Sequence, residues 1–461
     1  MRYISTRGGS PGLSFSDVLV GALAPDGGLF MPESWPVDAA VSPPDQDYTA
    51  AAFRVMRQFV GDCISGEDLA EDIKVAYMSF DPPGMAPLVE LEPGLYLLEL
   101  FHGPTLAFKD IAMQLLARLM SRELARRDAH ATILVATSGD TGSAAIAAFG
   151  GLPRIEIFVL HPQGRVSEVQ RRQMTTAPYV NVHNVALEGT FDDAQALVKT
   201  LFADRGFATA HSLIAVNSIN FVRIVAQSVY YFTTAAKLGR PARFVVPTGN
   251  FGDIFAGEAA ARMGVPVAGL IAATNANDIL ARALNEGVYA AREARATLSP
   301  SMDIQVASNF ERALFEASNR DHRWLSESME AFARERKLVI PSPVLAVLRA
   351  RYAAEAVSDD ETLRTIRNAH ERYGRVIDPH TAVGLATAGR LSHNDDLPIV
   401  VLSTAHPAKF PETVAKATGT VPPLPPHLRQ SYLGTERASV LPPEADRLRS
   451  FIETRTTPHE R

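Results

Sequence analysis

The stretch Ile-Leu-Val-Ala-Thr-Ser-Gly-Asp-Thr-Gly-Ser-Ala at residues 133–144 decides the fold class. It begins with an apolar run, passes through a short polar loop that contains glycine, and continues into small residues. This order predicts a strand over 132–136 and a helix over 141–149. A strand that leads through a glycine loop into a helix is typical of α/β proteins with parallel sheets.

The same order of strand, polar loop and helix occurs twice more along the chain. Residues 244–254 read Phe-Val-Val-Pro-Thr-Gly-Asn-Phe-Gly-Asp-Ile, and residues 400–407 read Val-Val-Leu-Ser-Thr-Ala-His-Pro. Further strands are predicted over 95–100, 155–160 and 270–273, and further helices over 49–60, 107–126, 253–263 and 279–284. Such alternation predicts two doubly wound α/β domains with sheets covered on both faces.

Changes of pattern along the chain predict three parts. Residues 1–80 form an N-terminal extension, which ends at the break Pro82-Pro83-Gly84. Residues 81–235 form a smaller α/β domain, and residues 236–461 form a larger one. The larger domain ends in a proline-rich segment over 420–446, which we expect to wrap around the surface.

Composition excludes several classes of protein. The chain has 461 residues, of which 46% are hydrophobic, so it can bury a large core. Its net charge is −6 and no basic stripe is visible, so nucleic acid is not an expected partner. The single cysteine, Cys63, rules out an internal disulfide framework and fits a reducing compartment. Without a signal peptide or a long apolar stretch, we expect a cytoplasmic protein with no membrane partner.

Two of the three loops have the form of anion-binding sites. Ligands of open α/β sheets bind at the carboxyl ends of the strands. Glycines in the loops 137–142 and 249–253 let the backbone approach an anion, and the following helix offers unpaired N–H groups. Neither loop matches a nucleotide-binding pattern. The alternative for each loop is an ordinary turn between a strand and a helix.

Lys109 lies in an apolar run, Phe-His-Gly-Pro-Thr-Leu-Ala-Phe-Lys-Asp at residues 101–110. Burial lowers the pKa of an amine, and an uncharged lysine can attack a carbonyl to form a Schiff base. The alternative is a lysine that packs its stem on the core and extends its ammonium group to water. Two anion sites beside such a lysine suit pyridoxal phosphate with an amino acid, which supply a cofactor phosphate and a substrate carboxylate.

These motifs together resemble the threonine synthase family. The resemblance rests on the runs at 101–110, 137–142 and 249–253, and also on Gly-Arg-Val-Ser at 164–167 and Ser-Thr-Ala-His-Pro at 403–407. The opening segments 3–8 and 26–30 resemble the longer-chain branch of the family. The resemblance extends from residue 1 to about 420. It implies the fold type II pyridoxal-phosphate architecture, similar to the tryptophan synthase β subunit.

The resemblance assigns Lys109 and the second loop to the cofactor. It implies that Lys109 carries pyridoxal 5'-phosphate as a Schiff base and then shuttles protons. It also implies that backbone N–H groups hold the cofactor phosphate at Gly249, Asn250, Phe251, Gly252 and Asp253. The other lysines lack the motif context of Lys109; they are Lys74, Lys199, Lys237, Lys337, Lys409 and Lys416.

The first and third loops receive roles in the same way. The resemblance implies that the substrate α-carboxylate binds at Thr137, Ser138, Gly139, Asp140 and Thr141. It also puts Asp140 near the ring hydroxyl of the cofactor, where a carboxylate is unexpected unless one group holds a proton. The alternative for Asp140 is a helix cap.

In the third loop, Thr404 or Ser403 is expected to meet the pyridine nitrogen through a hydroxyl group. The alternative for both residues is the N-cap of a helix near Glu412.

The substrate phosphate needs its own donors. Candidates are Asn217, Ser218, Asn220, Arg223 and Arg165, because arginine forks suit phosphate oxygens. A solvated surface ion pair is the alternative for each arginine. We interpret His102 and His406, which flank the motifs, as structural rather than catalytic. No metal site is predicted.

The implied reaction converts O-phospho-L-homoserine and water into L-threonine and phosphate, the work of a lyase acting on phosphates and the last step of threonine biosynthesis. Phosphate leaves Cγ and water adds at Cβ. One alternative is a related phospho-lyase that yields a keto acid, and another is a non-catalytic amino-acid-binding relative. The sequence leaves open whether the protein is a monomer or a homodimer.

Overall fold

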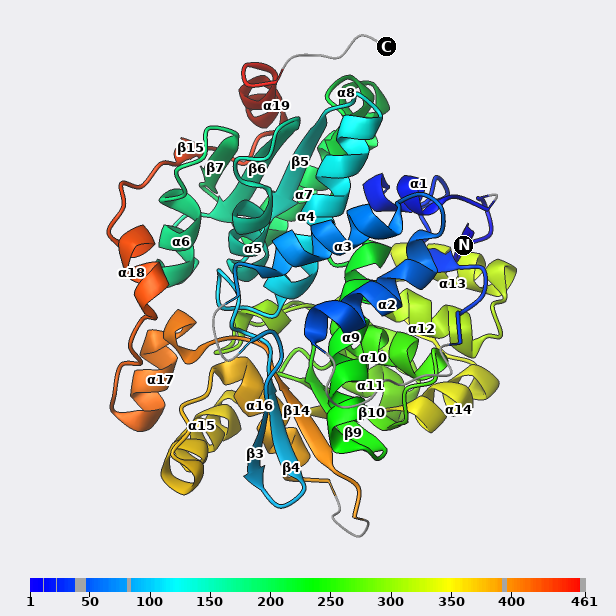
Figure 1. Cartoon of the computed structure of the whole chain (residues 1–461), viewed down its shortest axis with the longest axis vertical. Helices are drawn as coiled ribbons and strands as arrows, with labels where there is room; N and C mark the ends of the chain where they lie inside the picture. The colour runs from blue at the N-terminus through cyan, green and yellow to red at the C-terminus, as the bar shows by residue number, and fades with distance from the viewer. Residues whose placement is uncertain (11, 22, 38–46, 81–83, 392–395, 457–461) are drawn as a thin grey trace.

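Two sheets, each covered by helices, organise the chain (Figure 1). This architecture is seen in a computed structural model that describes residues 1–10, 12–21, 23–37, 47–80, 84–391 and 396–456. Pro82 and Pro83, which belong to the predicted domain break, lie outside the described residues. The predicted α/β class is confirmed.

The smaller sheet has five parallel strands in the order β15-β7-β6-β5-β8. Its central strands are apolar and buried on both faces, as a parallel sheet between helices requires. The strands are β5 Ala131–Ala136, β6 Ile155–Pro162, β7 Val182–Leu187, β8 Leu213–Ile214 and β15 Ser439–Leu441. The helices around it are α5 Asp140–Phe149, α6 Glu168–Thr175, α7 Phe191–Ala203, α8 Arg205–Ala210 and α19 Ala445–Glu453.

The larger sheet has six strands in the order β13-β10-β9-β14-β4-β3, and all pairs except β3 with β4 are parallel. The strands are β3 Leu88–Glu92, β4 Leu95–Glu99, β9 Ala242–Pro247, β10 Val267–Thr274, β13 Tyr352–Ala356 and β14 Ile399–Ser403. The helices on its two faces are α9 Phe221–Leu238, α10 Gly252–Arg262, α11 Ile279–Glu286, α15 Asp359–Tyr373 and α16 Pro379–Ala388.

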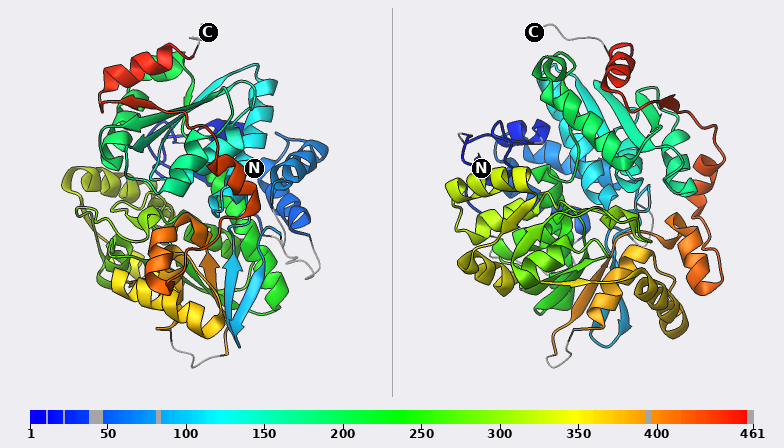
Figure 2. Two further views of the ribbon diagram at one scale, coloured as in Figure 1. Left: turned by 90° about the vertical axis from the view of Figure 1, so that its left-hand side faces the viewer. Right: turned by 180° about the vertical axis from the view of Figure 1, so that it is seen from behind.

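The sheets depart from the predicted contiguous domains at three strands. β3 and β4 fall within the predicted smaller domain, yet they pair with β14 in the larger sheet. β15 falls within the predicted larger domain, yet it pairs with β7 in the smaller sheet. Figure 2 shows how the C-terminal segment runs back along one side of the molecule to reach that sheet. The reason is that strand pairing depends on which chain segments meet in the folded protein, and local sequence does not encode that choice.

The N-terminal extension packs on two long buried helices, α4 Lys109–Arg126 and α9. It consists of β1 Tyr3–Ser5, β2 Phe30–Pro32, α1 Phe15–Val20, α2 Tyr48–Val60 and α3 Gly66–Tyr77. The remaining elements are α12 Phe310–Ala317, α13 His322–Glu335, α14 Ser342–Arg351, α17 Pro411–Thr418, α18 Pro426–Tyr432, β11 Val288–Ala290, β12 Lys337–Val339, and the 3₁₀ turns η1 Pro300–Met302 and η2 Pro407–Lys409.

The start of α4 differs from the prediction by two residues. Ala107 forms an isolated antiparallel bridge with Ala405, and Leu106 has a φ of 62°. The backbone therefore cannot be helical before Phe108. This bridge brings the third loop directly beside Lys109.

Among the described residues, no helix combines the length and the apolar character that crossing a membrane requires.

Arg312 on α12 ties the N-terminal extension to the larger half of the molecule. Its side chain is fully buried, and its Nη2 donates hydrogen bonds to the carbonyl oxygens of Phe30 at 3.1 Å and Ile219 at 2.7 Å. Burial lowers the pKa of the guanidinium to about 9, although neighbouring Glu311 opposes that shift. The buried guanidinium of Arg312 is thus held mainly by backbone carbonyl groups.

We expect Arg312→Met to lower the free energy of unfolding by about 3 kcal/mol, because each buried acceptor left without a donor costs about 1–3 kcal/mol. Equilibrium unfolding in urea measures the change. The control is Arg323→Met, whose side chain is 90% exposed in a surface ion pair, and it is expected to change stability by less than about 0.5 kcal/mol. Equal effects of the two substitutions would contradict the assignment.

Candidate active site

A cavity of about 200 Å³ lies where the carboxyl ends of strands from both sheets meet. This is the place where open α/β sheets bind ligands. Its wall includes residues that follow β5, β9 and β14, together with the start of α4 and part of α9. The lining residues are Phe108, Lys109, Ala136, Asp140, Thr141, Phe191, Gln195, Asn217, Ser218, Arg223, Gln227, Pro247, Thr248, Gly249, Asn250, Gly252, Asp253, Ser301, Met302, Ser308, His380 and Thr404.

Lys109 is the first residue of α4, and its side chain lines the cavity with only 13% exposure. The N–H of the preceding Phe108 donates to the carbonyl of Thr404 at 2.9 Å, which anchors this end of the helix to the third loop. Burial lowers the pKa of the Lys109 ammonium. Asp140 opposes that shift, whereas the charges of Lys409 and Arg223 add to it. The arrangement makes this amine easier to deprotonate than an exposed lysine.

The 249–253 loop forms the opposite wall of the cavity. Gly249, Asn250, Gly252 and Asp253 line it, whereas Phe251 is turned into the core, where its ring contacts Phe310 and Tyr352. A Cβ on Gly249 would lie 3.0 Å from Ile304 Cδ1, so the close approach there favours glycine. Since α10 begins at Gly252, its first N–H groups have no intrahelical acceptor. The loop can therefore bind an anion.

Asp253 carries a carboxyl group beside this anion site. Tyr230 and Tyr231 donate to its Oδ1, while its buried Oδ2 has no hydrogen-bond partner among the described residues. Burial raises the pKa of this carboxyl to about 7, against the opposing effect of the two tyrosines. A carboxyl with this raised pKa carries less negative charge near neutral pH than an ordinary aspartate, which reduces its repulsion of a bound phosphate.

The 137–141 loop leads into α5. The hydroxyl of Thr137 accepts hydrogen bonds from the N–H groups of Gly139 and Gly142, each at 2.9 Å, so it closes the loop on itself. Gly139 has a φ of 139°, and a Cβ there would lie 2.4 Å from Gln170 Cδ. Asp140 and Thr141 line the cavity, whereas Thr137, Ser138 and Gly139 do not.

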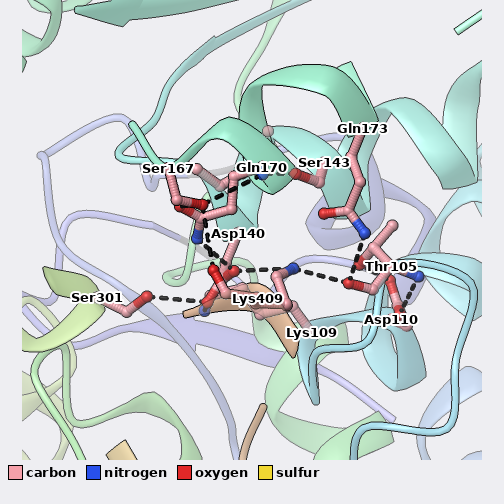
Figure 3. Close-up of polar contacts among 12 residues, drawn as sticks. Thr105, Lys109, Asp110, Asp140, Ser143, Ser167, Gln170, Gln173, Ser301 and Lys409 are labelled. Atoms are coloured by element: carbon pink, nitrogen blue, oxygen red, sulfur yellow. Dashed lines mark hydrogen bonds and ion pairs between the residues drawn. The ribbon is translucent and has the colours of Figure 1, made fainter. Parts of the chain in front are cut away.

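Asp140 is the centre of a buried polar cluster, which we call the Asp140 cluster: Asp140, Lys109, Lys409, Gln170 and Ser301 (Figure 3). Its Oδ1 lies 2.9 Å from Lys409 Nζ and accepts from Gln170 Nε2 at 2.8 Å. Its Oδ2 accepts from Ser301 Oγ at 2.9 Å and lies 3.4 Å from Lys109 Nζ.

The interpretation of Asp140 as a helix cap is wrong. Gly139 is the N-cap of α5, and no side chain caps it. Although burial alone raises the pKa of the Asp140 carboxyl, Lys409 and then Lys109 hold that pKa well below its ordinary value. Asp140 is therefore an ionised carboxylate inside the protein.

In the third loop, Thr404 lines the cavity and Ser403 does not. Ser403 ends β14, and its buried hydroxyl lies 2.9 Å from the hydroxyl of Thr381 on α16. Neither residue is a helix cap, because the N-cap of α17 is Phe410 and that of η2 is His406. The capping alternative is thus wrong for both.

The five candidates for the substrate phosphate separate into two groups. Asn217, Ser218 and Arg223 line the cavity. Asn220 instead caps α9 and donates to the carbonyl of Leu19, and Arg165 is exposed outside the lining.

Arg223 is a buried cation without a carboxylate partner among the described residues. Its side chain is part of the cavity wall, its Nε has no hydrogen-bond partner there, and its Nη1 donates to the carbonyl of Val216 at 3.4 Å. Burial lowers the pKa of the guanidinium to about 10. A buried cation left unpaired in a cavity wall suits an anionic ligand.

Several lining residues escaped the sequence prediction. His380 Nδ1 lies 2.8 Å from Asp378 Oδ1, and its Nε2 accepts from the N–H of Ser301 at 3.2 Å. The Asp-Pro-His-Thr run at 378–381, with its helix-capping aspartate, was the only local signal for it. Lys409, which lacks the motif context of Lys109, nevertheless belongs to the Asp140 cluster.

His102 and His406 do not line the cavity, and their interpretation as structural residues stays a prediction. His102 Nε2 lies 2.9 Å from Glu99 Oε2, and His406 Nδ1 accepts from the N–H of Ala408. Burial lowers the pKa of His406 to about 4. Among the described residues, no cluster of three or more His, Cys, Asp or Glu side chains suits a metal ion.

Comparison with known proteins relates this site to one family. Family models match residues 2–77 (Threonine synthase N terminus), 80–341 (Pyridoxal-phosphate dependent enzyme) and 381–452 (Threonine synthase, C-terminal). The threonine synthase of Pseudomonas aeruginosa is 48% identical over 98% of both chains. The crystal structure of pyridoxal-phosphate-bound threonine synthase from Brucella melitensis superposes with a TM-score of 0.95 at 46% identity, over 99% of both chains. The yeast enzyme superposes at 0.92, with 37% identity over 98% of both chains.

The raised pKa of Asp253 predicts a pH-dependent loss of stability. The folded chain keeps this proton up to about pH 7, whereas the unfolded chain releases it near the ordinary value of 3.8. The free energy of unfolding therefore falls as pH rises through this window. The substitution Asp253→Asn would keep an acceptor oxygen for both tyrosines without a titrating group. We thus expect the stability of Asp253→Asn relative to wild type to rise by about 2 to 4 kcal/mol between about pH 4 and about pH 8.

Chemical unfolding at a series of pH values measures this difference. The control is Asp360→Asn, which removes an exposed carboxyl from the first turn of α15. Parallel stability curves for wild type and Asp253→Asn would contradict the assignment of a neutral buried carboxyl.

Proposed function

The chain belongs to the threonine synthase family of pyridoxal-phosphate-dependent enzymes, and from this premise we propose that it converts O-phospho-L-homoserine and water into L-threonine and phosphate. One observation carries the proposal. A buried amine, Lys109, shares a cavity with an anion-binding loop at 249–253 and with the guanidinium of Arg223, whose Nε has no hydrogen-bond partner among the described residues. The loop suits the phosphate of the cofactor, and the guanidinium suits the phosphate of the substrate.

The residues of the cavity fit pyridoxal phosphate. The 249–253 loop offers helix N-terminal N–H groups to the phosphate, and the raised pKa of Asp253 reduces the repulsion there. Thr404 supplies a hydroxyl in the cavity wall, the group we assign to the pyridine nitrogen. When bound, the cofactor supplies an electron sink that stabilises negative charge on the substrate carbon atoms.

Lys109 is the base that this reaction requires. Its pKa is lowered by burial, so the uncharged amine can form the bond to the cofactor and, once released, accept the proton from Cα of the substrate. We assign to the same Nζ the return of a proton at Cγ after phosphate leaves. The low exposure of the side chain limits competing protonation by water.

The two ends of the substrate have separate partners. We assign its carboxylate to the first turn of α5 at Asp140 and Thr141, where N–H groups lack intrahelical acceptors. We assign its phosphate to Arg223 with Asn217 and Ser218, which share one part of the cavity wall. Binding at both ends holds Cα and Cβ near the Lys109 amine, which is the positioning that elimination and water addition need.

We also propose a location and an oligomeric state for the protein. The single cysteine supports a reducing, cytoplasmic location. We propose a monomer or a homodimer, because the residues of one chain suffice to line the cavity.

Purified protein supplied with O-phospho-L-homoserine is expected to release threonine and phosphate in equal amounts. Lys109→Ala should abolish turnover and the visible absorption of the covalently bound cofactor, because no other amine replaces it. Amino-acid analysis and borohydride trapping followed by peptide mapping provide the measurements. A keto acid from O-phosphothreonine without threonine formation would indicate the phospho-lyase, and binding without turnover would indicate a non-catalytic relative.

Arg223→Met is expected to raise KM for O-phospho-L-homoserine by about 10-fold or more, because a charge-assisted hydrogen bond contributes about 1.5–3 kcal/mol. Steady-state kinetics gives the value, and Arg223→Lys should recover part of the loss. Arg165→Met, at the exposed arginine outside the cavity, is expected to leave KM within about twofold. A larger effect at Arg165 than at Arg223 would reverse the assignment.

A further inference from the structure

Lys409 is a lysine without any exposed surface, and its ammonium group is held from two sides. Its Nζ donates to the carbonyl of Thr105 at 2.7 Å and lies 2.9 Å from Asp140 Oδ1. A buried ammonium is costly unless it is paired and hydrogen-bonded. Lys409 meets both conditions through its contacts with Asp140 and Thr105.

Asp140 is placed between two amines that differ in environment. Lys409 is fully enclosed and makes the shorter contact, whereas Lys109 lines the cavity at 3.4 Å from the other carboxylate oxygen. Figure 3 shows Lys409 reaching both Asp140 and Thr105, with Lys109 close to the same carboxylate. Gln170 and Ser301 donate to the carboxylate as well. The charge of Asp140 therefore does not depend on Lys109 alone.

We propose that Lys409 is a positioning residue: it is the permanent counter-ion of Asp140, and it thereby releases Lys109 to act as an uncharged amine. The inference rests on the proposed role of Lys109 in the reaction. It also explains how a carboxylate can be accommodated near the cofactor, since Lys409, which does not line the cavity, neutralises it from within the protein.

The balance of charge around Lys109 supports this role. If Asp140 had no other cation, its buried carboxylate would hold a proton on Lys109, because a buried unpaired charge is strongly unfavourable. With Lys409 present, the Lys409–Asp140 ion pair has no net charge. A second ammonium at Lys109 would then lack a carboxylate of its own. The charged or titratable groups that face this centre are Asp140 on α5, Lys409 on η2, Arg223 on α9, Asp253 on α10, His380 on α16 and Asp110 on α4.

The cluster also joins the two sheets. Asp140 and Gln170 belong to helices beside the smaller sheet, whereas Lys409 follows β14 of the larger sheet. Lys409 therefore sets the position of Asp140 across the cavity in addition to its charge. A test must separate these two effects, and the pH dependence of Lys109 reactivity does so.

The experiment measures covalent capture of pyridoxal phosphate by the full-length chain stripped of cofactor. In this step Lys109 Nζ bonds to the aldehyde carbon with loss of water, and borohydride then adds hydride to that carbon so that the product survives peptide mapping. The rate is recorded from about pH 6 to about pH 10. We expect Lys409→Gln, which keeps a donor but loses the charge, to raise the pH of half-maximal rate by about one unit or more. At neutral pH its capture should be about 10-fold slower.

Three further variants complete the test. Lys409→Arg keeps the charge and is expected to restore most of the wild-type profile, while Lys416→Gln, at a lysine on α17 outside the Asp140 cluster, should leave it unchanged. Lys409→Gln/Asp140→Asn removes both charges, and its half-maximum should lie below that of Lys409→Gln. A wild-type half-maximum in Lys409→Gln overturns the proposal, as does the same upward shift in Lys409→Arg.

Two outcomes are kept distinct. If Lys409→Gln does not fold, the double variant is compared with Asp140→Asn. A higher pH of half-maximal rate in the double variant supports the proposal, because Lys409 no longer repels the Lys109 ammonium. Equal values overturn it. If wild-type protein is labelled at a lysine other than Lys109, or forms no threonine, the proposed function fails. A label on Lys109 that is insensitive to Lys409 defeats only the present inference.

Discussion

The buried carboxylate of Asp140 is the contact on which the arrangement of the cavity depends. It accepts from donors that belong to both halves of the molecule, and an ionised group at this depth needs all of them to offset its desolvation. Its requirement for cations brings Lys409 and Lys109 together although 300 residues separate them.

The charges in the wall of the cavity suit anionic ligands. Arg223 is a cation without a protein anion among the described residues, and burial raises the pKa of the Asp253 carboxyl to about 7. Both conditions raise the free energy of the protein without ligand, and both favour bound phosphate. Such strained electrostatics are typical of functional sites, where stability is reduced in favour of binding and reactivity.

Sequence reasoning located the parts of the site that depend on local structure. Loops that follow a buried strand and precede a helix are visible as patterns, so the 249–253 loop, apart from Phe251, and Thr141 were found and line one cavity with Lys109. The pairing of side chains was not visible. Asp140 has the sequence position of a helix cap, yet its carboxylate turns to Lys409, because a buried ion pair outweighs the modest gain from capping. His380 and Ser301 reach the cavity through elements without a distinctive motif.

The sequence alone predicted the α/β class and two loops of the form that binds anions, because periodicity, glycine geometry and helix ends act over a few neighbouring residues. The role of Lys109 rested on the family resemblance of its motif. The tertiary structure decided which strands complete each sheet, that Thr404 rather than Ser403 faces the cavity, and which cation neutralises Asp140. These outcomes depend on contacts between residues far apart in the chain. Such contacts form only when folding brings the residues together and removes water from between them. Local patterns therefore predicted the strands, helices and loops that form the cavity, and only packing decided how its charges are balanced.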